Sequence, residues 1–482
     1  MTDTYQTELN KWIAKEKLAM ELMHVVSGLW LDHSIELIIF RRKIIDNSVS
    51  TILNDHLYAR RYINLPLSID ISLKLAKAIR EIGEQLAPSK IDLGKLSAEW
   101  LEEKDQYNSE KEFIADKLKN LGNGNFKLQP KDVVLYGFGR IGRLAARILI
   151  AEAGKGEQLR LKAIVTRSNS DEDILKRANL LRKDSIHGKM AGTIIEDLEQ
   201  KTLIINGQRV HMIAANDPSE IDYTKYEINN ALLIDNTGVW RDRAGLGQHL
   251  KSKGIEKVLF TAPGKDLPDI VYGVNNEVAE NRDENIYTAA SCTTNCIAPV
   301  LKVIEDEIGI EKGHVETVHS YTNDQNLLDN YHKKYRRGKS APLNMVITST
   351  GAAKAVAKVL PVLKGKLTGN AVRVPTPNVS LAILNLELKQ NTSKEAINQL
   401  LRKASMEGDL VEQIDFSTSN ELVSTDVVGN PHAAVVDSPS TIVSEDGKSI
   451  VLYAWYDNEY GYTRQVIRLA KLIAGVIRLR YY

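Results

Sequence analysis

The chain contains only two cysteines, Cys292 and Cys296, and both lie in the short motif SCTTNC. Two thiols so close together could bind a metal, pack inertly in a core or supply one nucleophile. Zinc fits poorly, because two cysteines need further ligands with similar local spacing and none is nearby. Apolar residues at helical spacing follow the motif, so Ser291 is predicted to cap a helix that has Cys292 in its first turn. The helix dipole and the unpaired amides there should lower the pKa of the Cys292 thiol toward neutrality, whereas Cys296, one turn deeper, is predicted to be buried.

A nucleophilic cysteine needs a base, and His319 stands 27 residues after Cys292, where an apolar run ends in the polar residues of HSYT. A histidine at such a strand end can take up and return protons at the edge of a cleft. From spacing alone, a structural histidine is the simpler interpretation. A thiolate beside a bound nicotinamide would oxidise an aldehyde through a thiohemiacetal and a thioester.

A second group of residues with chemical meaning is the glycine motif GFGRIG, which follows the apolar run 133–136 and opens the helical stretch 143–151. In a dinucleotide-binding unit such glycines allow a tight turn, a close approach of the backbone to a pyrophosphate, and tight packing of helix on strand. The anion then rests on the helix N-terminus. Gly137, Gly139 and Gly142 are therefore predicted to bind a dinucleotide, with a purely structural glycine turn as the alternative.

The next apolar run, 162–165, is followed by TRSN, where NAD-binding proteins of this kind carry an acid that accepts hydrogen bonds from the ribose. Arg167 and the hydroxyls beside it suit a 2′-phosphate, so we expect NADP to be accepted, either instead of NAD or together with it. The alternative is that the strand ends a few residues later and that Asp171 or Asp173 folds back.

Length and composition predict a folded chain with more than one domain. The 482 residues are 43% hydrophobic and carry 63 Lys+Arg against 62 Asp+Glu, which predicts two or three globular domains and disfavours nucleic acid as a partner. No apolar stretch reaches the roughly 18 residues that span a bilayer, so no membrane association is expected. The first residues, MTDTYQTELNKW, do not resemble a signal peptide, and the expected location is cytoplasmic.

Sequence patterns divide this predicted α/β protein into parts. Residues 1–125 have few glycines and helical spacing of apolar residues, which predicts a helical N-terminal extension. In 130–290, short apolar runs alternate with helical stretches, as in a Rossmann-type dinucleotide-binding domain with a parallel sheet. In 291–457 the strands lengthen, which suits an α+β domain with a mostly antiparallel sheet. A terminal helix is predicted from Thr463 to Leu479.

Six motifs resemble, in the right order, the phosphorylating glyceraldehyde-3-phosphate dehydrogenase family over about residues 131–482: YGFGRIGR, SCTTNC, HSYT, STGAAKA, KLTGNAVRVPTPNVS and WYDNEYGYT. The resemblance implies that 130–290 binds the dinucleotide, that 291–457 is the catalytic domain, and that the C-terminal helix within 458–482 returns to the dinucleotide-binding domain. It also implies a homotetramer that acts on a sugar phosphate and inorganic phosphate with NAD or NADP. The chain is thus identified as an N-terminally extended member of this family.

The resemblance also implies roles for individual residues. Cys292 would be the nucleophile, with its amide helping to hold the oxyanion, and His319 would be the base that also assists hydride transfer. Phosphate groups would be bound by hydroxyls, a flexible glycine and a guanidinium, namely Ser291, Thr293, Thr322, Thr350, Gly351 and Arg373. Cofactor contacts are implied, besides the glycines and Arg167, for Arg140, Ile141, Thr237, Thr261 and Asn458. Asn458 would hold the nicotinamide amide, while Thr237 and Thr261 could simply end strands; no metal is expected.

The chain departs from the family pattern after the predicted base. The segment reads TNDQ where the common pattern is TATQ, so Asp324 would lie close to a substrate phosphate. Together with DNYH at 329–332 and with Arg336 and Arg337, this segment is similar to erythrose-4-phosphate dehydrogenases, relatives that release a free acid. STGAAKA and KLTGNAVRVPTP match the glyceraldehyde-3-phosphate enzymes better, so that activity is the main prediction. A third hypothesis is a non-enzymatic cofactor-binding scaffold whose partner docks on the N-terminal helices, but the intact Cys292 and His319 speak against it.

Overall fold

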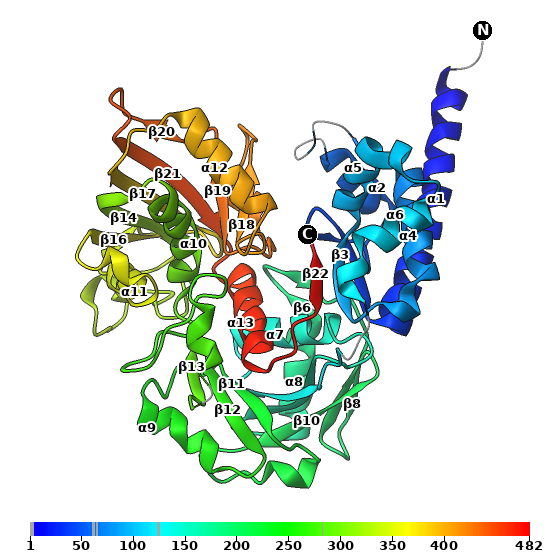
Figure 1. Ribbon diagram of the computed structural model, residues 1–482. Helices are drawn as coiled ribbons and strands as arrows, with labels where there is room; N and C mark the ends of the chain where they lie inside the picture. The colour runs from blue at the N-terminus through cyan, green and yellow to red at the C-terminus, as the bar shows by residue number, and fades with distance from the viewer. Residues whose placement is uncertain (1–3, 60–62, 64–65, 123–125, 282) are drawn as a thin grey trace. The chain divides into compact units, whose positions relative to one another are not determined.

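The computed structural model describes residues 4–59, 63, 66–122, 126–281 and 283–482 (Figure 1). The chain forms two compact units. Unit 1 comprises residues within 1–130, 153–158 and 475–482, and unit 2 comprises 131–152 and 159–474. The domain boundary predicted at residue 125 lies outside the described residues. No helix in the described part of the chain combines the length and the apolar character that crossing a membrane requires.

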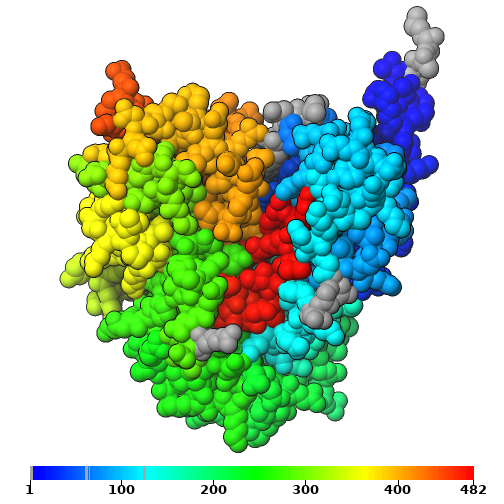
Figure 2. Space-filling model, in the orientation of Figure 1, coloured from blue at the N-terminus to red at the C-terminus, as the bar shows by residue number. Residues whose placement is uncertain are grey.

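In the described residues of unit 1, five α-helices accompany a small sheet. The helices are α1 (Thr4–His33), α2 (Val49–Tyr58), α4 (Ile69–Glu81), α5 (Leu93–Glu103) and α6 (Glu110–Lys117). The sheet has the order β2-β1-β3-β22, formed by β1 (Ile35–Ile39), β2 (Arg42–Lys43), β3 (Ser89–Asp92) and β22 (Leu479–Tyr481). Figure 2 shows the first turns of α1 projecting at the surface, where Tyr5 and Trp12 are exposed.

The small sheet was not predicted from the sequence, because β1 is a short apolar run buried along its whole length and such a run has no strand periodicity. The predicted C-terminal end of the terminal helix is also wrong. Helix α13 (Tyr460–Ile473) stops before Gly475, whose φ of +67° breaks the helix, and the chain continues into β22. β22 pairs in parallel with β3, so the last residues of the chain complete the sheet of unit 1.

The first sheet of unit 2 has eight strands in the order β13-β12-β11-β4-β5-β10-β9-β8. Their bounds are β4 (Lys131–Tyr136), β5 (Leu159–Thr166), β8 (Ile194–Asp197), β9 (Thr202–Ile205), β10 (Gln208–Ala214), β11 (Ala231–Asp235), β12 (Ile255–Phe260) and β13 (Ile286–Thr288). The six strands from β13 to β10 are parallel, whereas β9 and β8 are antiparallel additions. The order reverses beside β4, and ligands of such sheets bind at the carboxyl ends of the strands at this point.

The described helices that accompany this sheet are α7 (Arg140–Ala151), α8 (Asp171–Arg182) and α9 (Arg243–Leu246), together with a hairpin of β6 (Lys183–Asp184) and β7 (Gly188–Lys189). Helix α13 packs along α7, and Glu152, just after α7, forms ion pairs with Arg464 and Lys471 of α13. Figure 1 shows α13 and α7 side by side. The end of the dehydrogenase-like region therefore returns to the first sheet of unit 2.

The second sheet of unit 2 has the order β15-β16-β14-β17-β21-β19-β18, with β20 beside β21. The strands are β14 (Ile310–Ser320), β15 (Val346–Thr348), β16 (Leu367–Val374), β17 (Ser380–Leu388), β18 (Ile414–Ser417), β19 (Ala434–Asp437), β20 (Ile442–Val443) and β21 (Ser449–Tyr456). Five of the seven strand pairings described are antiparallel. The predicted fold class, a Rossmann-type unit followed by an α+β part with a mostly antiparallel sheet, is confirmed.

One face of the second sheet is covered by α10 (Cys292–Glu307), α11 (Ala352–Val359) and α12 (Lys394–Met406), as Figure 1 shows. Buried and less buried residues alternate along β17 and β21, because successive side chains of a strand point to opposite faces. The inward side chains pack with Ile297, Leu301 and Ile304 of α10 in one core. This packing fixes the N-terminal end of α10, which begins at Cys292.

Candidate active site

Local hydrogen bonds set the position of Cys292. The hydroxyl of Ser291 accepts the backbone N–H of Thr294 at 3.0 Å, which confirms the predicted cap and makes Cys292 the first residue of α10. The preceding Ala290 has a φ of +53°, a left-handed conformation that is unfavourable for alanine. The hydroxyl of Tyr462 donates to the carbonyl of Ala290 at 2.9 Å and so helps to hold this turn. Strained backbone of this kind is common at active sites.

Strand register brings the predicted base to the thiol. His319 lies near the end of β14, and its Nε2 is 3.6 Å from Sγ of Cys292. β14 pairs in parallel with β16, and this register places His319 opposite Arg373. Nδ1 of His319 is 2.7 Å from the carbonyl oxygen of Ser320, which also accepts Nη1 of Arg373 at 2.8 Å. In the tautomer with its proton on Nδ1, His319 makes this bond, Nη1 of Arg373, 2.9 Å from Nδ1, donates to the carbonyl instead, and the lone pair of Nε2 faces the thiol, as a base requires.

Burial dominates the ionisation of this pair. It raises the pKa of the Cys292 thiol, although the positive charge of Arg373 and hydrogen bonds near Thr293 oppose the rise. Burial and the charge of Arg373 together lower the pKa of His319 to about 3. The expectation of a thiol pKa lowered toward neutrality is therefore wrong for the ligand-free chain, since desolvation outweighs the helix N-terminus. Burial therefore favours the uncharged forms of both the thiol and the imidazole in the ligand-free chain.

Cys296 lies deeper in α10 and is completely buried, with Sγ 3.9 Å from the carbonyl oxygen of Ala454. Burial raises the pKa of the Cys296 thiol well above its ordinary value. The predicted burial of Cys296 is confirmed, whereas the reactivity of Cys292 stays a prediction. Among the described residues, no three His, Cys, Asp or Glu side chains gather as metal ligands would.

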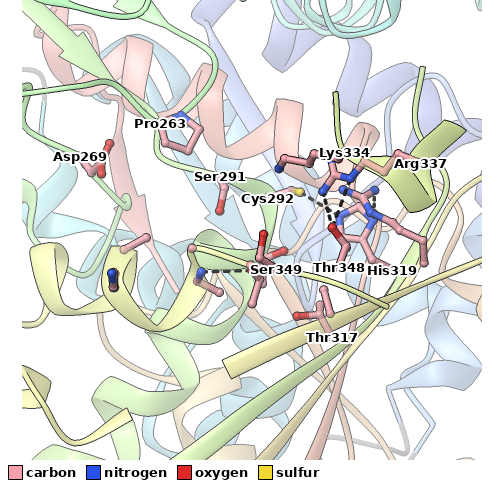
Figure 3. Close-up of a pocket in the computed structure, with 18 of the residues that line it drawn as sticks. Pro263, Asp269, Ser291, Cys292, Thr317, His319, Lys334, Arg337, Thr348 and Ser349 are labelled. Carbon is pink, nitrogen blue, oxygen red and sulfur yellow. Dashed lines mark hydrogen bonds between the residues drawn. The ribbon is translucent and has the colours of Figure 1, made fainter. Parts of the chain in front are cut away.

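Cys292 and His319 open into a pocket of about 430 Å³ (Figure 3). The pocket brings together five of the six residues predicted to bind phosphate: Ser291, Thr293, Thr350, Gly351 and Arg373. Thr322 does not line it. The other polar lining residues include several that sequence reasoning did not assign to the site: Asp269, Thr317, Lys334, Arg337, Thr348, Ser349, Lys354 and Lys358. The spacing of Lys354 and Lys358, four residues apart in a helical stretch, could have indicated that both lie on one face.

Arg337 enters the pocket from the segment that departs from the family pattern. Its guanidinium forms an ion pair with Asp324 and donates to Oγ1 of Thr348 at 3.1 and 3.3 Å. Asp324 is thus engaged by Arg337, and its charge is not directed at the pocket as the sequence suggested. The acid instead orients a guanidinium, which lies with Lys334 and His319 on one side of the pocket in Figure 3. Two arginines and three lysines therefore give the pocket a surplus of positive charge.

The glycine motif forms a second pocket at the carboxyl end of β4. Gly137 has a φ of +90°, and a Cβ on Gly142 would lie 2.3 Å from the carbonyl oxygen of Gly137. A Cβ on Gly139 would meet no atom within 4 Å, and no side chain caps α7 there. The first and third glycines thus serve the turn and its packing, while the second leaves open space over a helix N-terminus. A dinucleotide pyrophosphate fits this arrangement.

This second pocket has a volume of about 430 Å³ and is lined by Gly137, Gly139, Arg167 and Thr237 among the predicted cofactor residues. Arg177 of α8, which was not predicted, also lines it. β5 ends at Thr166, and Asp171 begins α8 and pairs with Lys201 at 2.5 Å. Asp173 also lies in the first turn of α8, and neither acid lines the pocket, so the alternative in which Asp171 or Asp173 folds back to the strand end is wrong.

The remaining predicted cofactor residues do not line that pocket. Arg140, the first residue of α7, forms ion pairs with Glu459, the residue before α13, and with Asp184 of β6. Ile141 and Gly142 continue α7, and Thr261 donates to the carbonyl of Asp235 at 3.0 Å.

Asn458 is connected to the catalytic strand. The hydroxyl of Ser380 donates to Oδ1 of Asn458 at 2.9 Å and accepts the backbone N–H of Ser320 at 3.1 Å. Two hydrogen bonds through the Ser380 hydroxyl therefore connect Ser320, the residue after His319, to Asn458. They leave the side-chain nitrogen of Asn458 as the donor for a ligand.

Comparisons with known proteins agree with this geometry. Residues 131–243 match the family model for the NAD-binding domain of glyceraldehyde 3-phosphate dehydrogenase, and residues 291–458 match the model for its C-terminal domain. The glyceraldehyde-3-phosphate dehydrogenases of Priestia megaterium and Bacillus subtilis (enzyme 1) are 42% and 41% identical to the chain. These alignments cover 71% of this chain and 97% and 98% of the relatives.

A glyceraldehyde-3-phosphate dehydrogenase-like protein of Pseudomonas aeruginosa is 52% identical over 461 residues, which are 94% of this chain and 98% of the relative. An alignment of that extent includes most of the region before the glycine motif, whereas the shorter relatives match only the remainder. The predicted resemblance is confirmed: the chain belongs to the glyceraldehyde-3-phosphate dehydrogenase family, as a member lengthened at its N-terminus.

Proposed function

We propose that this chain catalyses the phosphorylating oxidation of glyceraldehyde 3-phosphate, or its reverse, with NAD or NADP. The observation that carries the proposal is the 3.6 Å approach of the Cys292 thiol to Nε2 of His319 inside a cationic pocket. A nucleophile, its base and several phosphate-binding groups are what an acyl-thioester route to an acyl phosphate requires.

Cys292 starts the reaction when its sulfur attacks the aldehyde carbon and its proton passes to Nε2 of His319. The backbone N–H of Cys292, at the start of α10, stabilises the resulting oxyanion. His319 returns this proton to give the thiohemiacetal hydroxyl and takes it again as the carbon loses hydride. The nicotinamide cofactor, when bound, supplies the hydride acceptor. Inorganic phosphate then attacks the Cys292 thioester, and the C–S bond breaks to release the acyl phosphate and the thiolate.

Positive charge positions both phosphates in this proposal. Arg373 contacts His319 and lines the pocket, so a phosphate held there is close to the reacting carbon. Arg337 is held by Asp324 and Thr348, and these contacts orient its guanidinium. Asp324 itself does not line the pocket. Ser291, Thr350 and Gly351 supply hydroxyls and an open backbone for the second anion.

We also propose that NADP is accepted. Arg167 directly follows β5 and lines the cofactor pocket, in the place where an acid would repel a 2′-phosphate. The proposal includes a cytoplasmic homotetramer, which light scattering on the purified chain and cell fractionation test.

Steady-state kinetics on the purified full chain test the reaction. We expect glyceraldehyde 3-phosphate to be oxidised faster than erythrose 4-phosphate, and only when inorganic phosphate is present. Faster oxidation of erythrose 4-phosphate without a need for phosphate would instead establish the free-acid reaction. Cys292→Ser should abolish turnover and leave cofactor binding intact, whereas a scaffold would keep its function in this variant.

A further inference from the structure

Two arginines line the wall of the cofactor pocket at the carboxyl end of β5. Arg167 follows the strand directly, and Arg177 comes from the second turn of α8. Within the part of the chain that the structure describes, neither guanidinium forms an ion pair with a carboxylate, and Nε of Arg177 is buried without a hydrogen-bond partner. A buried donor without a partner beside a second positive charge is unfavourable until an anion binds.

Two of the three acids that open α8 are paired elsewhere, and the third, Asp173, one turn before Arg177, forms no ion pair with it among the described residues. Glu172 pairs with Lys176 at 2.7 Å on the outer side of α8, and Asp171 pairs with Lys201. These ion pairs leave the two pocket arginines available to a ligand. The pattern differs from a solvated charged helix face, where the basic residues pair with acids one turn away.

The position of the arginines identifies the ligand group. Gly139 lies in the same pocket, and the open space over its Cα at the start of α7 fits a pyrophosphate. In this fold the adenosine ribose extends from the pyrophosphate toward the end of the second strand, which here is β5. A group on the ribose 2′-oxygen therefore meets the residues that follow β5.

We infer that Arg167 and Arg177 together form a subsite for the 2′-phosphate of NADP, in which Arg177 supplies the second charged contact. Guanidinium groups match phosphate oxygens in charge and in donor geometry, and each such bond is strong in a partly buried site. The inference rests on the proposed use of a nicotinamide dinucleotide and assigns a specificity role to a residue outside the glycine motif.

Equilibrium binding of NADP and NAD to Arg177→Leu tests the inference. Calorimetry, or the fluorescence of Trp240 in the pocket wall, gives both Kd values without turnover. Losing one charge-assisted contact should raise the Kd for NADP about 10- to 100-fold and change the Kd for NAD by less than about threefold. Adenosine 2′-monophosphate should lose affinity as NADP does. Lys176→Leu, on the same helix but paired with Glu172, is the matched control and should leave the NADP-to-NAD ratio unchanged.

Equal losses for NADP and NAD in Arg177→Leu, or no loss for either, would overturn the subsite. Arg177→Lys should recover part of the NADP affinity, because it restores the charge but not the forked donor geometry. The test is independent of the proposed reaction, since the affinity ratio is measured without a sugar phosphate. Phosphate-dependent aldehyde oxidation with NAD would still establish the reaction if the subsite fails. If neither NAD nor NADP supports phosphate-dependent aldehyde oxidation, the proposed reaction is refuted, and the ratio of the NADP and NAD Kd values still tests the subsite.

Discussion

Replacing Arg373 by Met should slow the reaction of Cys292 with a neutral alkylating agent. Nη1 of Arg373 is 2.9 Å from Nδ1 of His319, and Nε2 of the same ring is 3.6 Å from the sulfur of Cys292. The two contacts are made by the two nitrogens of one imidazole ring, so the guanidinium lies within about 9 Å of the sulfur. At an effective dielectric constant of about 20, the attraction between thiolate and guanidinium is then about 2 kcal/mol.

A loss of about 2 kcal/mol raises the pKa of the thiol and lowers the thiolate fraction about 25-fold at a pH below that pKa. The sign follows from the charges, because a nearby cation favours the thiolate and its removal disfavours it. The second-order rate constant for iodoacetamide, measured against pH on the ligand-free chain, reports this directly, since only the thiolate reacts.

The matched control is Arg336→Met, which removes a neighbouring arginine that does not line the pocket. Its pH profile should follow the parent protein. An unchanged profile in Arg373→Met, or one displaced to lower pH, would refute the assignment of Arg373 as the group that holds the thiol pKa down against burial. Alkylation of the Cys292→Ser variant measures any contribution from Cys296.

Three further predictions concern stability and binding. The pKa of His319 is lowered to about 3 from its ordinary value near 6.5, so between these values the folded state binds fewer protons than the unfolded chain. The stability of the folded state therefore falls as pH drops through this window. The pH dependence of the free energy of unfolding should be shallower in His319→Gln, and equal slopes would argue against the burial of a neutral imidazole. Gly142→Ala should lower the free energy of unfolding by about 1–3 kcal/mol, because the added methyl group overpacks against Gly137. Gly139→Ala should keep most of the stability but lose the rise in Tm that NAD produces, and a normal rise in Gly139→Ala would show that the pyrophosphate lies elsewhere. Deleting residues 477–482 removes β22 from beside β3 and should increase hydrogen exchange in β3 and α5, with unchanged exchange disproving a structural role for the last strand.

The parts of the site that sequence predicts well depend on neighbours in the chain. The cap by Ser291 is a bond between residues three positions apart, and the glycine motif is recognised because a strand precedes it and a helix follows. Burial of Cys296 follows from helical periodicity in the same way. These features come from backbone geometry and side-chain chemistry within one or two turns, so the residue types alone determine them.

The tertiary structure decided what depends on distant segments. Arg373 meets His319 through the register of β14 and β16, 54 residues apart, and Arg177 reaches the cofactor pocket through the orientation of α8. Thr322, one of the predicted phosphate ligands, lies outside the pocket. β22 pairs with β3, which begins 390 residues earlier in the chain (479 − 89). Burial likewise sets the direction in which the pKa of the Cys292 thiol shifts, because desolvation depends on all the groups packed around the sulfur. The motifs were enough to identify the nucleophile, its base and the glycine turn, because each depends on residue type and on near neighbours in the chain. Packing and strand register set which other side chains join them, because those contacts form between distant segments.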